Sequence, residues 1–279
     1  MNLDARAQRL LDRRIVNSEP LAGGDICEVR RLILDDGASL VAKSTPHAHL
    51  EARMLADLAL ADAPVPKVIS IEGDLLIMTD LGGRAGLAGP AAAEEAGRRL
   101  ALLHSHVGDR FGYEYDTVIG PLPQDNRPCD DWPAFYAERR LLTMARMAKE
   151  AGRLPIVTLR RIERLSGNLD RWLAHRPAAS LVHGDFWSGN VVSVPDRLCG
   201  FIDPAIYRGD SEMDLAMLAL FGGLNDAFLR GYGSVRRIAS AFFEKRMALY
   251  QLWPLLVHVR LFGGGYLTSV ERILARYDA

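Results

Sequence analysis

The sequence contains little cysteine and no long apolar run. Its three cysteines, Cys27, Cys129 and Cys199, are widely spaced among 279 residues. Their odd number and spacing argue against a disulfide framework or a zinc site and favour a reducing compartment. No apolar run reaches the length of about 18 residues that a membrane-spanning helix needs, and the charged, amphipathic first segment does not resemble a secretory signal. We therefore expect a cytoplasmic protein without a membrane partner.

An excess of charge of either sign is also missing. The chain carries 34 Lys and Arg against 35 Asp and Glu, a formal net charge of −1. Nucleic-acid-binding surfaces are basic, so nucleic acid is not an expected partner. Apolar residues make up 49% of the chain and charged residues 25%, which is typical of globular proteins. The length is sufficient for one large domain or for two lobes.

The first eighty residues follow a mostly β-type pattern. Residues 28–44 and 65–81 each contain two short β-type runs around a Gly-containing turn, which predicts two hairpins. Helical periodicity at 3–14 and 49–61 predicts one helix before the hairpins and one between them. The Gly-rich stretch 81–90 interrupts this pattern and marks a lobe boundary.

The pattern beyond this boundary is mainly helical. Helices are expected after Pro90, over 131–151, over 155–174 and through most of 211–277. Residues 108–130 are expected to form a loop, and 180–203 contain three short β-type pieces around polar turns. The fold class is therefore α+β, with a small β-rich N-lobe of residues 1–81 and a larger helical C-lobe of residues 82–279. A cleft between two such lobes is the expected ligand site.

The stretch "LVHGDFWSGN" (181–190) places Asp185 and Asn190 in a polar turn between strand-like runs. Asp203 follows at the end of the next apolar run, in "CGFIDPA". A kinase catalytic loop has the same order: an Asp, then an Asn five positions later, then a metal-binding Asp after the next strand. This pattern predicts that Asn190 and Asp203 bind Mg²⁺ and that Asp185 faces a substrate hydroxyl. Capping of turns is the alternative explanation for any one of the three.

The first lobe contains a second kinase-like signal. A kinase pairs a strand lysine with a glutamate of the following helix above the nucleotide phosphates. "LVAKS" places Lys43 at the end of a β-type run, and "HLEARML" places Glu51 in the first turn of the next predicted helix. Each alone would be an ordinary surface charge, but in this order they predict an ion pair that anchors ATP.

A glycine-containing turn precedes this pair. "LAGGDICEV" (21–29) places Gly23 and Gly24 between two β-type runs, where backbone N–H groups could cover the phosphates of ATP. The stretch lacks a full G-x-G-x-x-G pattern, and an ordinary hairpin turn is the alternative. Adenine is then expected to meet the backbone between the lobes, at Thr79, Asp80 and Leu81.

These motifs resemble the fructosamine kinase (ketosamine kinase) family, whose protein-kinase-like fold is related to that of the aminoglycoside phosphotransferases. "HGD" and the following Asn are shared by that whole group, whereas "HGDFWSGN" is similar to the fructosamine kinases in particular. Three further stretches are also similar to this family: "IGPLPQDN" (119–126), "DWPAFYAERRL" (131–141) and "IDPAIYRGDSEMDLAMLALFGG" (202–223). The resemblance covers about residues 8–270. One departure is Asp25, which follows Gly23-Gly24 in a phosphate loop that is more Gly-rich in many relatives.

The resemblance implies an ATP-dependent kinase that phosphorylates a sugar hydroxyl of a ketosamine, free or protein-bound. The product would be unstable and release the amine, so the role would be deglycation. By position, Asp185 would be the catalytic base, and His183 and Asp214 would brace the catalytic loop. The oligomeric state stays open.

Substrate contacts are expected near the same motifs. Trp187 either stacks on the sugar or packs the catalytic loop against a helix. Tyr207 could contact the amine side of the substrate. Asp210 and Glu212 could do so too, although a solvated loop is the favoured placement for both.

Two other functions fit parts of the pattern. A phosphotransferase for aminoglycosides or another small hydroxylated amine is the main alternative, but the C-terminal helices lack the acidic cluster that a polycationic substrate would favour. A pseudokinase that binds nucleotide without catalysis is the second. It is disfavoured because Lys43, Asp185, Asn190 and Asp203 are all present.

Overall fold

The computed structural model describes residues 2–21 and 27–277. The chain forms two compact units, each built from three separate segments. Unit 1 comprises Met1–Leu103, Trp187–Ala205 and Asn225–Arg236, and unit 2 comprises His104–Phe186, Ile206–Leu224 and Arg237–Ala279. The lobe boundary between residues 81 and 82 stays a prediction. Within the described residues, no helix combines the length and the hydropathy that a membrane span requires.

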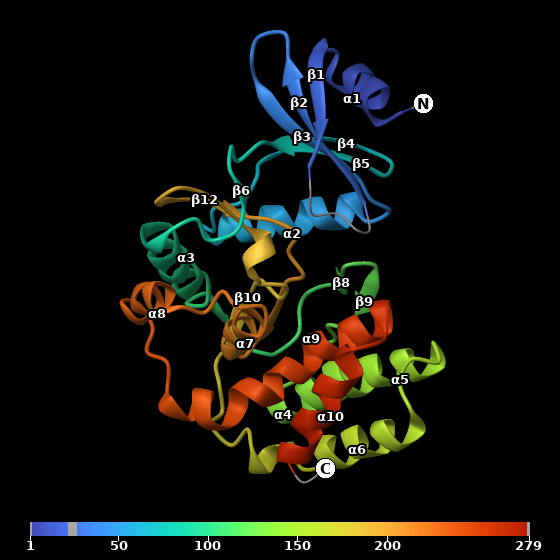
Figure 1. The fold of residues 1–279 in the computed structure, drawn as a ribbon, viewed down its shortest axis with the longest axis vertical. Coiled ribbons are helices and arrows are strands. Elements are labelled where there is room, and N and C mark those ends of the chain that lie inside the picture. Colours follow the sequence, from blue (N-terminus) through green and yellow to red (C-terminus); the bar gives the residue numbers. More distant parts are fainter. Residues whose placement is uncertain (1, 22–26, 278–279) are drawn as a thin grey trace. The chain divides into compact units, whose positions relative to one another are not determined.

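Unit 1 contains an antiparallel sheet with the strand order β1-β2-β3-β5-β4 (Figure 1). The strands are β1 (Ile15–Pro20), β2 (Glu28–Leu34), β3 (Ser39–Ser44), β4 (Val68–Glu72) and β5 (Leu75–Thr79). Two helices, α1 (Leu3–Leu11) and α2 (Ala48–Leu60), complete this part. Both predicted hairpins and both predicted helices are therefore confirmed.

The side chains of this sheet alternate between two apolar clusters. Leu40, Leu75 and Ile77 pack in one cluster with Leu3 of α1. Leu76 and Met78 pack in the other with residues of α2, among them Leu55. Because successive residues of a strand point to opposite faces, α1 and α2 cover opposite faces of the sheet. Burial on both faces explains the unbroken apolar run of β5.

The rest of unit 1 combines a second small sheet with two crossing helices. β6 (Arg84–Ala85), β11 (Val191–Val194) and β12 (Arg197–Phe201) form the sheet in the order β12-β11-β6. α3 (Pro90–Leu103) packs against α8 (Asp226–Gly233). Their backbones approach so closely that a Cβ atom at Gly97 would overlap the Phe228 carbonyl, and one at Gly231 would overlap Glu94.

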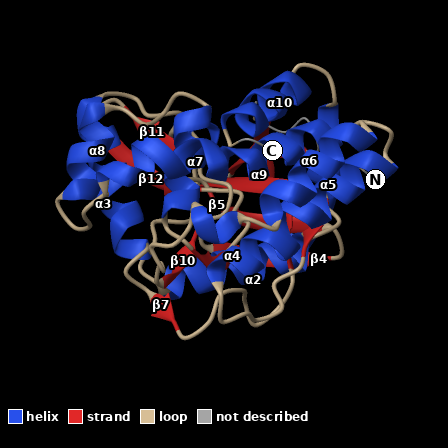
Figure 2. Ribbon diagram, turned by 90° about the horizontal axis from the view of Figure 1, so that it is seen from below, coloured by secondary structure: helices blue, strands red, loops and turns tan. Residues whose placement is uncertain are grey.

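Unit 2 combines a short sheet with several helices. β7 (Val107–Gly108), β10 (Ala179–Val182) and β13 (Tyr207–Gly209) pair in the order β13-β10-β7. The helices are α4 (Trp132–Phe135), which continues through a π-helical stretch (Tyr136–Leu142) into α5 (Thr143–Glu150), then α6 (Ile156–Ser166), α7 (Glu212–Leu220), a second π-helical stretch (Phe242–Arg246), α9 (Met247–Phe262) and α10 (Tyr266–Arg276). Figure 2 shows α5, α6, α9 and α10 gathered together.

One sequence expectation in unit 2 was wrong in part. Residues 108–130 were expected to form a loop, but they contain a hairpin of β8 (Thr117–Ile119) and β9 (Leu122–Gln124). Each strand has three residues and Pro123 lies within one of them, so no alternating pattern long enough to detect exists. The Gly-rich stretch 263–265 separates two helices, because α9 ends at Phe262 and α10 begins at Tyr266.

The close crossing of α3 and α8 predicts different effects for two glycines of one helix. Gly231→Ala should lower the free energy of unfolding by about 2 kcal/mol or more, because the two backbones must separate. Gly233→Ala should leave it equal or raise it by up to about 1 kcal/mol, since a Cβ atom there meets open space and Ala favours a helix. Urea unfolding measures both, and equal stability of the two variants would contradict the crossing.

Candidate active site

In unit 1, a buried lysine lies between two carboxylates. Lys43 Nζ lies 2.9 Å from Glu51 Oε1 and 2.7 Å from Asp203 Oδ1. The alternation of β3 explains the first contact: Leu40 and Ala42 face α1, so Lys43 points to the opposite face, where α2 carries Glu51 in its first turn. Lys43 and Glu51 are 9% and 6% exposed, whereas the Asp203 side chain is 41% exposed. The expected Lys43–Glu51 ion pair is therefore present.

Burial and charge act in opposite directions on this cluster. Burial alone would lower the pKa of Lys43, but the Asp203 and Glu51 carboxylates outweigh it and raise the pKa well above its usual value. Burial raises the pKa of Glu51 although Lys43 opposes the shift. With both carboxylates ionised, the cluster carries one negative charge more than Lys43 balances. A cation beside the exposed part of Asp203 would therefore be favoured.

The backbone brings Asn190 and Asp203 to one end of a hairpin. β11 and β12 pair so that Val191 lies opposite Phe201, and the Ile202 N–H donates to the Asn190 carbonyl at 3.0 Å. Asp203 follows with a left-handed φ of 54°, a conformation that Asp adopts more readily than most residues. Both side chains offer oxygen, the donor that Mg²⁺ prefers. This donor set fits a magnesium ion.

The segment expected to meet adenine follows β5. The Thr79 N–H donates to the Lys67 carbonyl, and the Asp80 N–H donates to the Ser39 carbonyl. The Asp80 carboxylate accepts from Arg31 at 2.5 Å, and hydrogen bonds from Arg31 and other donors hold its pKa below the usual value despite burial. The two backbone hydrogen bonds occupy the N–H groups of Thr79 and Asp80, and the contact of the segment 79–81 with adenine stays a prediction. Gly200 packs closely against Leu81, because a Cβ there would approach Leu81 Cδ1 to 3.0 Å.

In unit 2, one buried carboxylate holds the turn that precedes Asp185. Asp214, near the start of α7, accepts from the His183 N–H at 2.7 Å and from the Gly184 N–H at 2.9 Å. His104 Nε2 lies 3.0 Å from the same carboxylate and donates to it, because an ionised carboxylate can only accept. Asp185 comes next and is partly exposed. The bracing geometry expected for Asp214 is thus present, and His183 takes part through its backbone.

Trp187 lies over its own turn. Its side chain is among the exposed large hydrophobic ones, at 37%, and a Cβ atom at Gly189 would overlap the indole ring. Within unit 1 the ring therefore covers Gly189 and keeps part of its surface accessible to solvent.

Gly23 and Gly24, which were expected to cover the phosphates of ATP, lie outside the described residues.

The placement expected for Asp210 and Glu212 was wrong. Both are buried, at 2% and 9% exposure, not solvated. Asp210 Oδ2 accepts from the Tyr250 hydroxyl and lies 2.6 Å from His175 Nε2. Arg246 binds both oxygens of Glu212 at 2.6 Å. These partners lie 34 to 40 positions away along the chain, which is why the local pattern did not indicate burial.

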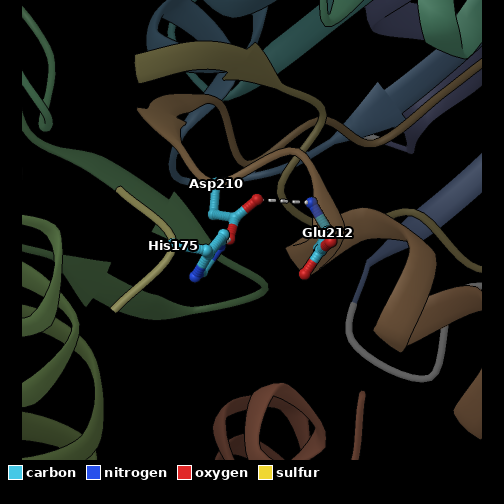
Figure 3. Close-up of side chains that lie close together, drawn as sticks. All are labelled: His175, Asp210 and Glu212. Atoms are coloured by element: carbon cyan, nitrogen blue, oxygen red, sulfur yellow. Dashed lines mark hydrogen bonds and ion pairs between the residues drawn. The ribbon is translucent and has the colours of Figure 1, made fainter. Parts of the chain in front are cut away.

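Figure 3 shows His175, Asp210 and Glu212 side by side. One potential ligand atom of each lies within 4.8 Å of the others. Burial raises the pKa of Glu212 although Arg246 opposes the shift. A metal ion here would have to displace the Arg246 guanidinium or lie beside it. We therefore describe the cluster as an ion-pair network.

Tyr207 is also fully buried, packed below the Arg140 guanidinium. Its burial favours a packing role, and the substrate contact suggested by its position in the sequence stays a prediction.

The fold is that of a phosphotransferase of the protein-kinase-like class. The structure superposes on aminoglycoside phosphotransferase APH(4)-Ia with a TM-score of 0.69 at 14% identity, over 98% of this chain and 99% of that one, a likeness that concerns the fold alone. A protein from Thermobifida fusca described as a candidate fructosamine-3-kinase superposes with a TM-score of 0.86 at 35% identity, over 99% of both chains.

The sequence comparisons identify the family. The family model named fructosamine kinase matches residues 6–278, so the chain belongs to the fructosamine kinase family. A probable ketoamine kinase of Synechocystis is 40% identical over 64% of this chain and 59% of that protein. One of Escherichia coli K12 is 37% identical over 76% and 74%. The matched part is thus about six tenths of the Synechocystis relative's length and three quarters of the E. coli relative's.

The contacts of Asp214 predict a cost for its neutral isostere. Asp214→Asn replaces one acceptor with an NH₂ group that faces N–H donors. The free energy of unfolding should fall by about 1–3 kcal/mol, the cost of unsatisfied buried groups. Hydrogen exchange at the His183 and Gly184 amides should accelerate. Asp226→Asn, in the exposed first turn of α8, is the control and should change stability by less than about 0.5 kcal/mol. Unchanged exchange in Asp214→Asn would contradict the bracing role.

Proposed function

We propose that the protein uses ATP to phosphorylate a sugar hydroxyl of a ketosamine, with a role in deglycation. The observation that carries the proposal is the Lys43–Glu51–Asp203 cluster within unit 1, in a chain of the fructosamine kinase family. Kinases hold nucleotide phosphates with such a Lys–Glu pair. The names of the relatives, ketoamine kinase and fructosamine-3-kinase, support the substrate class.

Lys43 would supply positive charge to the phosphates. Its ammonium is fixed by Glu51 and stays protonated because its pKa is raised. Phosphoryl transfer depends mainly on positioning and on neutralising charge, so a rigid, always charged lysine suits it. Leu81 would contact adenine through its backbone, together with Thr79 and Asp80 as neighbours, and Gly23 and Gly24 would cover the phosphates.

Asn190 and Asp203 would hold Mg²⁺. Bound Mg²⁺ neutralises charge on the transferring phosphate. The chain's own contribution is to fix the two oxygen donors on one hairpin, through the Ile202–Asn190 hydrogen bond and the pairing of Val191 with Phe201.

Asp185 would accept the proton of the acceptor hydroxyl. Asp214 fixes the two residues before it, His183 and Gly184, by their N–H groups, so the Asp185 backbone starts from a defined position. A general base must lie within hydrogen-bond reach of the proton that it takes, which makes this positioning part of the chemistry. Trp187, with a partly exposed ring, would shield or stack on the sugar.

The substrate is proposed to be nearly neutral. Asp210 and Glu212, at the start of α7, already contact His175, Tyr250 and Arg246. They are therefore not available to attract a polycation such as an aminoglycoside.

We also propose the cytoplasm as the location, since Cys27, Cys129 and Cys199 are free. The division into an N-lobe of residues 1–81 and a C-lobe is kept as part of the proposal.

A substrate panel tests this function. Purified protein with ATP and Mg²⁺ should release ADP with a ribulosyl- or fructosyl-amine, and mass spectrometry should find the phosphorylated ketosamine. Kanamycin or hygromycin should give no ADP above the background without acceptor. Turnover of the aminoglycoside alone would replace the proposal with its main alternative, and nucleotide binding without turnover of any acceptor would indicate a pseudokinase.

The proposed base predicts the effect of Asp185→Asn. The variant keeps the size of the side chain but removes the proton acceptor, so turnover should fall by about 10²–10⁴-fold, the usual contribution of a general base. Binding of MgATP, measured by calorimetry, should be unchanged. Asp109→Asn, at an exposed position in unit 2, serves as the control and should keep full turnover. An Asp185→Asn enzyme with near-normal turnover would exclude this residue as the base.

The buried ion pair predicts a pH-dependent cost for Lys43→Met. The variant should bind MgATP at least about 10-fold more weakly, because one charge-assisted contact is lost. It leaves Glu51 buried without its cation, so the folded-state pKa of Glu51 rises further above the unfolded value. When the pKa of a carboxyl group is raised in the folded state, the free energy of unfolding falls as pH rises above the unfolded pKa of about 4.3.

The stability deficit of Lys43→Met relative to wild type should therefore be largest near neutral pH and narrow as pH falls toward that value. Urea unfolding between pH 4 and 8 measures the deficit, with the exposed Lys67→Met as the matched control. A deficit independent of pH would contradict the described pairing of Lys43 with Glu51.

A further inference from the structure

Two family-like motifs carry no residue of the proposed chemistry, yet they meet in the core of unit 2. Asn126 ends "IGPLPQDN", and Arg140 belongs to "DWPAFYAERRL". Arg140 Nη2 donates to Asn126 Oδ1 at 2.8 Å, and both residues are fully buried. The structure therefore joins these motifs through one polar contact.

Arg140 is buried among neutral acceptors. Its Nη1 donates to the backbone carbonyls of Asp125 and Arg139, at 2.9 and 3.1 Å. Its guanidinium lies 4.0 Å from the centroid of the Tyr207 ring. Burial lowers the pKa of Arg140, which reflects the cost of a buried cation. A charge in this setting is a poor source of stability, so a role in placing its neighbours is the better explanation.

The other end of the Asn126 side chain holds the chain that follows Asp203. Asn126 Nδ2 donates to Thr117 Oγ1 at 2.8 Å and reaches the Ile206 carbonyl at 3.5 Å. Thr117 Oγ1 donates to the same carbonyl at 3.1 Å. We call Thr117, Asn126 and Arg140 the Asn126 bracket. It holds the Ile206 carbonyl by hydrogen bonds and covers the Tyr207 ring with the guanidinium.

The bracket acts on the strand beside the catalytic turn. Tyr207 begins β13 and pairs with Val182, the last residue of β10. Val182 is followed directly by His183 and Gly184, whose N–H groups Asp214 holds. A shift at Ile206 and Tyr207 would therefore pass to the start of the Asp185 turn through one strand pair.

We propose that Asn126 and Arg140 are positioning residues that set the place of the Asp185 turn. They touch no substrate and act through Ile206, Tyr207 and β10. The inference rests on the proposed function, in which Asp185 is the base, and it assigns a task to two motifs that the chemistry leaves unused.

One substitution separates positioning from stability. Asn126→Asp gives the buried Arg140 a carboxylate partner, so the fold should be maintained. It also replaces the Nδ2 donor with an oxygen that faces the carbonyls of Tyr115 and Ile206. Oxygen opposite oxygen is repulsive, so the Ile206 segment should move although the protein stays folded.

A second variant tests the same contact from another residue. Thr117→Val keeps the shape of the side chain but removes the hydroxyl that donates to the Ile206 carbonyl. Its matched control is Thr158→Val in α6, because Thr158 is equally buried and its hydroxyl bonds to Glu271, outside the bracket.

The expected result is a loss of rate without a loss of binding. In Asn126→Asp and Thr117→Val, the single-turnover rate of phosphoryl transfer to a ribulosyl-amine should fall by about 10- to 100-fold, as expected for a misplaced reacting group. The KM for the ketosamine should change by less than about 3-fold, since the substrate contacts remain. Thr158→Val should match wild type in both. Hydrogen exchange of peptides covering 181–185 should accelerate in the two bracket variants only.

The outcomes are separable. Folded Asn126→Asp with the wild-type rate and exchange would overturn the inference, and so would a rise in KM with an unchanged rate. If Asn126→Asp does not fold, Thr117→Val against Thr158→Val decides by the same criteria. If the wild-type protein phosphorylates no ketosamine, the proposed function fails, and the exchange of 181–185 alone supports or overturns the bracket.

Discussion

The buried ammonium of Lys43 joins β3, α2 and the chain after β12 within unit 1. A charge with 9% exposure is costly unless opposite charges or hydrogen-bond partners reach it. β3 points Lys43 to the α2 side of the sheet, so α2 must begin where Glu51 can approach, and the chain after β12 must bring Asp203 to the same point. These contacts add to the apolar cluster that packs α2 on the sheet. The excess negative charge that results favours a cation beside Asp203.

In unit 2 the buried group is a carboxylate, and hydrogen-bond donors satisfy it. Asp214 is a carboxylate with 1% exposure, and two backbone N–H groups and His104 satisfy it. Because those N–H groups belong to the two residues before Asp185, the cost of burying a charge is offset by hydrogen bonds that also order the turn at Asp185. In both units a buried ionised group thus fixes backbone that carries a proposed active-site residue.

Local patterns in the sequence predicted the features that depend on strand and helix periods. Lys43 and Glu51 could be paired in advance because a strand lysine followed by a glutamate on the next helix matches the kinase pattern. The spacing of Asn190 and Asp203 agrees with their place at one hairpin, whereas their grouping with Asp185 stays a prediction. Asp210 and Glu212 could not be placed, since their burial depends on Arg246 and Tyr250, which nothing local to them indicates. The Asn126–Arg140 contact was hidden for the same reason.

Asp214 and the Asn126 bracket both act on the segment that carries Asn190 and Asp203. Residues 183–206 leave β10 and return to β13, and Val182 pairs with Tyr207 where the excursion closes. Asp214 holds its first two residues, and the Asn126 bracket holds its last. Because both ends are fixed to the same strand pair, the conformations open to the intervening chain are reduced before any ligand binds. The two motifs without catalytic residues therefore act on the same stretch as Asp214, from its opposite end.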